Sequence, residues 1–273
     1  MLYKLLQQVA LGVACLMMGL APARAETIKM GGTGAVTSLL EILGQAFERL
    51  SPGDKVVVVP RLGSTGGTKA VEAGAVDLGV TGRDLTPQEV AAGLKVQPFL
   101  ETPFVFATDT RDPLNFSMAE ILRVYSGETL TYADGVPIRL ILRPRNDAQT
   151  LMLLQTFKGM DAAMDKARLR QELPTAATDQ DNMDVAAKMP GAFAGFPLTQ
   201  FLAEPNKLKV ASIDGVAPTT ESLAAGKYPL RLQVTWVFKG AHKPTTERFL
   251  AFIRGPEVAA IIARHGGTLV KAD

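Results

Sequence analysis

The chain is poor in the residues that most often build catalytic and metal centres. Among its 273 residues it has one cysteine, Cys15, and two histidines, His242 and His265. Cys15 lies in the apolar N-terminal segment, so the remainder of the chain can form no disulfide. Neither histidine stands in a metal-ligand spacing, and no His–Cys pair exists outside that segment. We therefore expect no metal site and no cofactor.

Neither sign of charge is in excess. The chain has 29 basic and 27 acidic residues, and removing Lys4 and Arg24 with the N-terminal segment leaves 27 of each sign. Nucleic acids and anionic membrane surfaces attract chains with a basic excess, so we expect neither as a partner. No second apolar run is long enough to span a bilayer.

The first 25 residues have the pattern of a secretory signal. Lys4 precedes an apolar stretch over residues 9–20, and Ala23-Arg24-Ala25 supplies a small-x-small cleavage pattern. This predicts a signal peptide over residues 1–25, cleaved before Glu26. An uncleaved membrane anchor and lipidation at Cys15 are less favoured alternatives, because the apolar run is short for a spanning helix of about 20 residues. The product is expected to be exported.

Strand and helix patterns alternate along the rest of the chain. Repeated β-α-β order implies a mostly parallel sheet with helices on both faces. We expect strands at residues 27–30, 56–59, 77–80, 103–107, 138–142, 191–197 and 228–238. We expect helices at residues 39–50, 68–73, 87–93, 117–125, 151–157, 160–174, 245–253 and 256–264.

Three of these elements carry further expectations. The four consecutive valines of residues 56–59 indicate a buried strand. The helices that follow Thr86 and Ser117 should each begin with a capping box, because a glutamate stands three residues later. The polar segment 160–174 shows little apolar face, so we expect it to be exposed.

Small and hydroxyl-bearing residues gather at three expected strand-to-helix turns. These turns are Gly31-Gly32-Thr33-Gly34, Gly63-Ser64-Thr65-Gly66-Gly67 and Thr81-Gly82-Arg83-Asp84, and a fourth candidate runs from Arg143 to Thr150. Free N–H groups at a helix start, together with the helix dipole, favour an anion. Hydroxyl groups and a guanidinium add further donors. One such turn is an ordinary connection, whereas four in one exported chain favour a shared anion site.

The chain resembles a known family over nearly its whole length after residue 25. The segments GSTGGTKAVEAGAVDLGVTGRDL, FSMAEILRVYSGETLTY, KVASIDGVAPTTESLAAGKYPLRLQVTWVFKG and FLAFIRGPEVAAIIARHGGTLV resemble, in order, those of phosphate-type periplasmic solute-binding proteins. The resemblance implies a two-lobed α/β fold of mixed, mostly parallel sheets. Two crossing strands, near residues 103–107 and 228–237, should join the lobes. Lobe 1 would comprise residues 26–105 and 230–273, and lobe 2 residues 106–229.

The resemblance also implies a function. The protein would be a periplasmic, monomeric, non-enzymatic binding protein that captures a small anion, phosphate or a related oxyanion, and delivers it to an ABC permease in the inner membrane. Carried over by motif position, the residues that line the cleft are Thr33, Gly34, Ser64, Thr65, Gly82 and Arg83 from lobe 1, and Arg143 and Thr150 from lobe 2. We expect Arg83 and Arg143 to face the anion from opposite walls.

The chain departs from the family pattern near its fourth loop. NDAQT stands where the family often has GSGT, so Ala148 and Gln149 replace a serine and a glycine, and one residue is added. Gly34 and Gly82 stand where donors or acceptors are common. The extra residue also makes Arg145 an alternative to Arg143, and another oxyanion or an organic acid is an alternative to phosphate.

Two other functions remain as alternatives. A sensor-type binding subunit would keep the fold and the ligand but pass the signal to another partner. An exported hydrolase would use Ser64, whose Gly-Ser-Thr-Gly-Gly context resembles a nucleophile elbow but lacks the second glycine at the required spacing and an evident histidine partner.

Overall fold

The computed structural model describes residues 26–109 and 114–271, so the expected signal peptide lies outside the described residues. None of the helices described in these two ranges is long and apolar enough to cross a membrane. The strands are β1 (Thr27–Gly32), β2 (Lys55–Val59), β3 (Leu78–Thr81), β4 (Leu94–Thr108), β5 (Asn115–Phe116), β6 (Arg139–Leu140), β7 (Ala192–Pro197), β8 (Lys209–Val210), β9 (Ser212–Ile213), β10 (Arg231–Lys239) and β11 (Thr268–Leu269).

The helices are η2 (Gly34–Val36), α2 (Thr37–Leu50), α3 (Gly63–Glu72), α4 (Pro87–Ala91), α5 (Met118–Ser126), α6 (Ala148–Thr156), α7 (Met160–Arg168), α8 (Asp179–Ala186), α9 (Leu198–Ala203), α10 (Thr220–Ala224), α11 (Pro244–Ile253) and α12 (Pro256–Arg264). Both expected capping boxes are confirmed, with Thr86 and Glu89 at the start of α4 and Ser117 and Glu120 at the start of α5.

One continuous sheet runs through both halves of the molecule, with the strand order β2-β1-β3-β10-β4-β7-β6 and with β8 and β11 also paired to β4. Strand β1 pairs in parallel with β2 and β3, and β6 pairs in parallel with β7. The antiparallel pairings described for this sheet all involve β4 or β10. The two longest strands therefore connect parallel units at either end.

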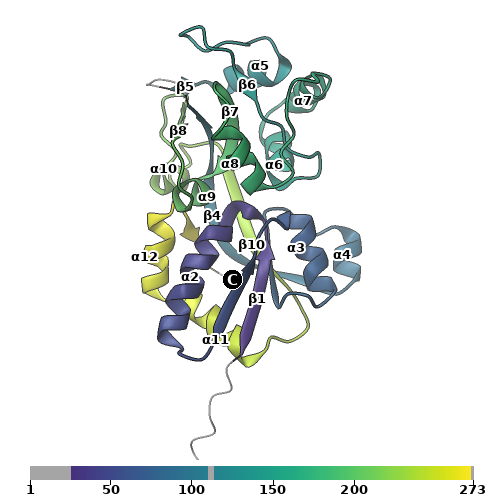
Figure 1. Cartoon of the computed structure of the whole chain (residues 1–273), viewed down its shortest axis with the longest axis vertical. Coiled ribbons are helices and arrows are strands. Elements are labelled where there is room, and N and C mark those ends of the chain that lie inside the picture. The colour runs from purple at the N-terminus through teal and green to yellow at the C-terminus, as the bar shows by residue number, and fades with distance from the viewer. Residues whose placement is uncertain (1–25, 110–113, 272–273) are drawn as a thin grey trace, which may run out of the picture.

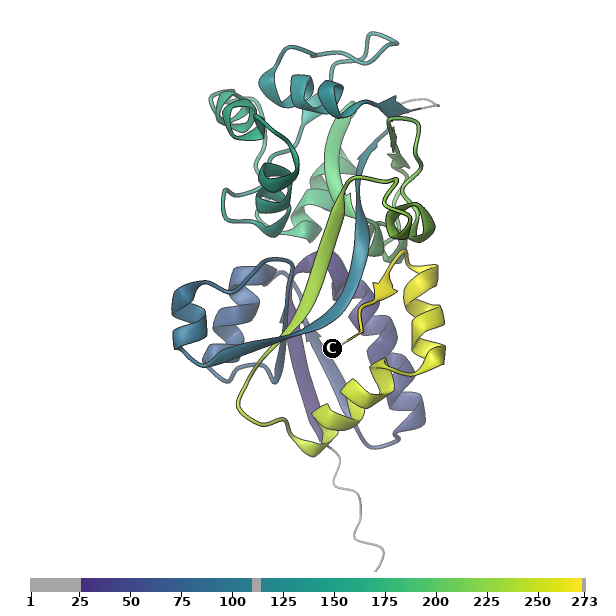
Figure 2. The ribbon, with the colours of Figure 1, turned by 180° about the vertical axis from the view of Figure 1, so that it is seen from behind.

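Strand β4 changes its partner where the chain passes between those units. Residues Leu94 to Pro103 pair with β10, whereas Phe104 to Ala107 pair with β7. Figures 1 and 2 show β4 and β10 running side by side between a lower and an upper lobe. We call the lower part, with β1–β3, α2–α4, α11 and α12, lobe 1, and the upper part, from β5 to α10, lobe 2. This is the two-lobed architecture with two crossing strands that the resemblance implies.

Aromatic side chains form much of the core along these crossing strands. In lobe 1, the ring of Trp236 on β10 stacks on Phe99 of β4 with centroids 4.2 Å apart. In lobe 2, Phe106 of β4 stacks on Phe193 of β7 at 4.9 Å. All four side chains are almost fully buried. The crossing strands are thus anchored on both sides of the junction between the lobes.

The expectation that residues 56–59 form a buried strand is wrong. Strand β2 is the edge strand of the sheet, and Val57 is 43% exposed. Helix α2 packs closely over Val56, because Gly44 has no side chain there to hold the two apart. The stiff side chains of a run of valines favour a strand, but this preference does not distinguish a central strand from an edge strand.

The expectation of an exposed helix at residues 160–174 is also wrong. Helix α7 ends at Arg168 and buries one face, which consists of Met160, Ala163, Met164 and Ala167. These residues follow the i, i+3, i+4, i+7 spacing of a core-facing stripe. The stripe was missed because two of its four members are alanines, which add little apolar area.

Candidate functional site

The first wall of the site lies at the carboxyl end of β1. A Cβ atom on residue 32 would overlap the carbonyl oxygen of Val80, so only glycine lets β1 approach β3 here. The N–H of Thr33 then donates to that same oxygen at 2.9 Å. The Thr33 hydroxyl accepts from the N–H of Ala35 at 3.4 Å and caps η2. This folding fixes the Thr33 hydroxyl and the Gly34 N–H on the side of lobe 1 that faces lobe 2.

The second glycine-rich segment is not a turn before a helix. Residues Gly63 to Gly67 form the first turns of α3, which begins five residues earlier than expected. Glycine and hydroxyl residues have low helix propensity, so the sequence pattern favours a turn. The Ser64 side chain accepts from the N–H of Gly82 at 3.2 Å and so ties α3 to the third loop.

Arg83 is held inside lobe 1 by its own neighbours. Its guanidinium donates to both carboxylate oxygens of Glu89, at 2.8 and 2.9 Å, and to the carbonyl of Asp84 at 2.7 Å. It also lies 3.4 Å from the Thr65 hydroxyl. The hydrogen bonds from Arg83 lower the pKa of Glu89 to about 2. All the contacts described for this guanidinium lie within lobe 1, and none links it to the groups around Arg143.

Arg143 follows β6 and is 8% exposed. Its guanidinium donates to Asp147 at 2.8 Å, to the carbonyl of Ala176 at 3.1 Å and to Asp179 at 3.1 Å. Asp147 is also the N-cap of α6, because it accepts from the N–H of Gln149 at 3.0 Å. The Asp147 carboxylate therefore caps α6 and also helps to orient Arg143.

The structure separates the two candidate arginines of this loop. Arg145 makes an exposed ion pair with Asp165 at 2.7 Å, and its side chain is 70% exposed. Arg143 instead is buried and donates to Asp179, which in turn contacts lobe 1. Thr150 is buried in the first turn of α6 and lines a very small cavity together with Arg143 and Gln149.

Asp179 is the residue that sequence reasoning missed. It is the first residue of α8, is 3% exposed, and accepts hydrogen bonds from both lobes. From lobe 1, the Thr33 hydroxyl lies 3.4 Å from Oδ2, and the Gly34 N–H also donates to the carboxylate. From lobe 2, Arg143 and the side-chain amide of Gln149 both donate to Oδ1. The only signal in the sequence is a capping box at Thr178, which predicts a helix start and an exposed first turn.

Burial dominates the electrostatics of this centre. It raises the pKa of Asp179, and the repulsion from Asp147 acts in the same direction, while Arg143 opposes both. Burial also raises the pKa of Glu204, which accepts from the Ser38 hydroxyl of α2 at 3.2 Å. One buried carboxylate, Asp179, is thus paired with one buried guanidinium, and the partly buried carboxylates of Asp147 and Glu204 lie nearby.

Seven of the eight predicted site residues fall into two networks, and the eighth, Thr150, lies in the first turn of α6. Thr33, Gly34 and Arg143 surround Asp179, whereas Ser64, Thr65, Gly82 and Arg83 form a network within lobe 1. The two networks are not joined by any hydrogen bond described for these residues. Gly82 and Arg83 line a cavity of about 470 Å³ between the lobes. Its other lining residues include Asp84 and Thr86 from lobe 1 and Ala148, Leu151, Met152 and Gln155 from α6.

Further contacts join the lobes beside Asp179. Arg61 precedes α3 and pairs with Asp181 and Asp184 of α8, the latter at 2.8 Å. Arg61 adopts a positive φ of 60°, which is unusual for a residue with a side chain. On α9, the Thr199 hydroxyl donates to the carbonyl of Ala35 at 2.6 Å. The lobes are therefore in direct contact along η2, α8 and α9.

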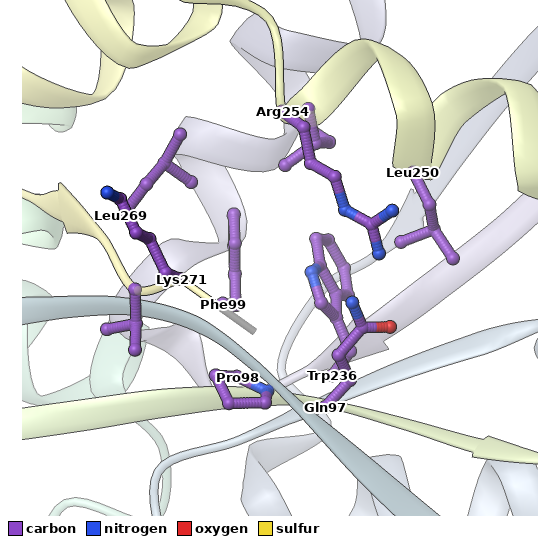
Figure 3. Close-up of a pocket in the computed structure, with 10 residues that line it drawn as sticks. Gln97, Pro98, Phe99, Trp236, Leu250, Arg254, Leu269 and Lys271 are labelled. Atoms are coloured by element: carbon purple, nitrogen blue, oxygen red, sulfur yellow. The ribbon is translucent and has the colours of Figure 1, made fainter. Parts of the chain in front are cut away.

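A separate cavity of about 550 Å³ lies within lobe 1 (Figure 3). Trp236 and Phe99 form its floor, and Arg254 extends toward the indole ring. Its lining residues come from β4, β10, α11 and the end of the chain, and none of the predicted anion-site residues is among them. It lies within one lobe and combines apolar side chains with the polar side chains of Gln97, Arg254 and Lys271.

Comparison with known proteins supports the architecture. Residues 20–257 match a family described as the PBP superfamily domain. The chain is 22% identical over 256 residues to the phosphate-binding protein PstS of Bacillus subtilis. This match covers 90% of this chain and 81% of that protein. It is 30% identical over 101 residues to the phosphate-binding protein PstS 2 of Streptococcus pneumoniae, and that match covers 37% of this chain and only 34% of the relative.

Solved structures show the same fold. A putative phosphate ABC transporter substrate-binding protein from Clostridium perfringens, with bound phosphate, superposes with a TM-score of 0.76 at 18% identity. The match covers 90% of this chain and all of that one. Because the family match extends over most of the chain, the resemblance read from the sequence is confirmed, and this protein belongs to the PBP superfamily.

Proposed function

We propose that this protein is an exported solute-binding protein that captures a small oxyanion between its lobes and delivers it to an ABC importer. The observation that carries the proposal is the set of donors that converges on the Asp179 carboxylate. A hydroxyl and a backbone N–H from lobe 1 and a guanidinium and an amide from lobe 2 surround one anionic group. A carboxylate and a phosphate accept from the same kinds of donor. This donor set is therefore suited to an oxyanion.

The relatives support phosphate as the first ligand to test. The two bacterial relatives are named as phosphate-binding proteins, and the solved structure is titled a putative phosphate ABC transporter substrate-binding protein with bound phosphate. We extend that ligand class, the permease partner and the periplasmic location to this chain as proposals. The same holds for the cleavage before Glu26, the monomeric state, and the division into residues 26–105 and 230–273 for lobe 1 and 106–229 for lobe 2.

Binding rather than catalysis is proposed because Ser64 lacks the partners of a nucleophile. Its hydroxyl oxygen accepts from the N–H of Gly82. His265 interacts with the carbonyl of Ile261 at 2.8 Å, and the ring of His242 packs on Phe238. Neither histidine is among the described partners of Ser64, and a serine nucleophile needs a base within hydrogen-bond reach. A sensor role would use the same ligand site and differs only in the partner.

A thermal-shift screen tests the proposed ligand class. The protein from Glu26 onward is heated with phosphate, sulfate and small carboxylates in turn, and its melting temperature is recorded. A ligand present at 100 times its dissociation constant stabilises the fold by about 2.7 kcal/mol. We expect phosphate or another oxyanion to raise the melting temperature. The same screen on Arg145→Ala should give the same shifts, since that side chain is exposed.

A further inference from the structure

Asp179 occupies the place where the donors of the two lobes meet. Its two carboxylate oxygens divide the donors between them. Oδ2 lies near the Thr33 hydroxyl, and Oδ1 accepts from Arg143 and Gln149. We propose that Asp179 is an internal competitor of the solute. Its carboxylate occupies the oxyanion position between the closed lobes, and the oxyanion binds by displacing it. This inference rests on the proposed function, since it concerns the same donors.

The packing leaves no room for two anions among these donors. A Cβ atom on residue 34 would lie 2.5 Å from the Asp179 Cβ and 2.7 Å from Oδ2. Real Cβ atoms do not approach so closely, so even one added carbon does not fit between η2 and α8. An oxyanion is much larger than one carbon atom. The solute and the Asp179 carboxylate therefore exclude each other from this place.

The charge balance leads to the same conclusion. Arg143 already pairs with the carboxylates of Asp147 and Asp179, and burial makes these charges interact strongly. Glu204, at the C-cap of α9, adds a further carboxylate. A second anion beside Arg143 would meet an excess of negative charge. Removing the Asp179 carboxylate from Arg143 relieves this repulsion and frees one donor for the solute.

The position of Asp179 in the fold makes its displacement feasible. It is the first residue of α8, so its side chain can leave the cleft without unfolding the helix. Its partners Thr33 and Gly34 belong to lobe 1, and separation of the lobes removes both. The Asp179 side chain then becomes accessible to water, which competes for its carboxylate. In this account, Asp179 also holds the lobes together when no solute is bound.

The test compares phosphate binding by the wild-type protein and by Asp179→Asn in calorimetric titrations. The variant keeps the shape of the side chain but removes the charge that competes for Arg143. We expect phosphate to bind about ten- to a hundredfold more tightly to the variant, the size expected for one hydrogen bond to a charged group. Asp161→Asn, at an exposed position on α7, makes the same charge change outside the donor set and should bind as the wild type does.

The pH dependence gives a second readout. Acid protonates Asp179 and weakens the competitor. The dissociation constant of the wild type, divided by that of Asp179→Asn, should therefore fall toward one as the pH is lowered. Phosphate titrates identically in both measurements and cancels from the ratio. The other charged groups that face this centre are Arg143 in the loop after β6, Asp147 at the N-cap of α6, Asp181 on α8 and Glu204 just after α9. They are present in both proteins, so the ratio isolates Asp179.

The outcomes separate this inference from the proposed function. If the wild type binds phosphate and Asp179→Asn binds it equally or more weakly, Asp179 is not a competitor, although the proposed function stands. If only the variant binds phosphate, the result supports both the proposed function and the role of Asp179 as a competitor. Asp179→Ala is measured as well, in case the asparagine amide blocks the site or prevents folding. If neither the wild type nor any folded variant binds phosphate, sulfate or a small carboxylate, both the inference and the proposed function are wrong.

Discussion

Arg143 and Asp179 form an ion pair of 3.1 Å in which both side chains are at least nine-tenths buried. The arginine comes from the loop after β6 and the aspartate from the start of α8, 36 residues later. Both belong to lobe 2, yet the carboxylate also accepts from Thr33 and Gly34 of lobe 1. The pair therefore links the arginine that we propose as the anion ligand to the closure of the two lobes.

Gly34→Ala should separate the lobes. The added methyl group would lie 2.5 Å from the Asp179 Cβ, a distance that neither backbone can accommodate without moving. We expect small-angle scattering to show a larger radius of gyration than for the wild type, both without added solute. Gly66→Ala is the matched control, because its new Cβ would lie 3.3 Å from the Leu62 side chain within lobe 1. Equal radii for Gly34→Ala and the wild type would show that this contact does not set the closure.

The sequence predicts the elements that carry Thr33, Gly34 and Arg143 because each follows a strand with a clear apolar pattern. The carboxyl ends of such strands meet at one edge of a sheet, where ligands commonly bind. The crossing strands are predictable for a similar reason, since their residues match the family in order. The sequence therefore proposes Arg143 and Thr150 as anion-site residues of the second lobe despite the altered NDAQT loop.

The partners of these residues are not predictable, because distant segments bring them together. Asp179 lies 146 positions from Thr33, and its local pattern indicates only a helix start. Arg83 pairs with Glu89, whose evident role in the sequence is the capping box of α4. Both cases require the tertiary structure, since a charged side chain pairs with whichever group the fold places beside it.

Arg61→Ala should also loosen the contact between the lobes. The change removes both ion pairs to Asp181 and Asp184, which lie on the opposite lobe. These pairs are largely exposed, so we expect little change in the melting temperature, but a larger radius of gyration without solute. Arg145→Ala removes an exposed pair within lobe 2 and should leave the radius unchanged. An unchanged radius in Arg61→Ala as well would exclude a role for these pairs in closure.

Arg83→Ala should affect stability more than phosphate binding. Loss of the guanidinium leaves the Glu89 carboxylate without its main partner, and we expect unfolding at neutral pH to become easier by about 1–3 kcal/mol. Chemical denaturation measures this difference. Phosphate affinity should change little, because Arg83 is committed to Glu89. A loss of affinity as large as that of Arg143→Ala would place Arg83 in the ligand site after all.

The same pair makes a pH-dependent contribution to stability. The pKa of Glu89 is lowered from 4.5 to about 2 in the folded protein. A lowered pKa stabilises the fold above the unfolded value, and this stabilisation is lost as the pH falls from about 4.5 toward 2. The difference in unfolding free energy between the wild type and Glu89→Gln should therefore shrink over this range. A difference that stays constant would mean that the Glu89 charge does not contribute.

The most direct test of the central claim is a calorimetric titration of Arg143→Ala and Arg145→Ala with the oxyanion that the thermal screen identifies. The two arginines stand two residues apart in one loop, but only Arg143 is buried and paired with Asp179, which contacts lobe 1. Our account predicts that Arg143→Ala weakens binding by about 2–5 kcal/mol, since it removes a desolvated, charge-assisted contact. Arg145→Ala should bind as the wild type does. Full affinity in folded Arg143→Ala would contradict an oxyanion site between the lobes at this arginine.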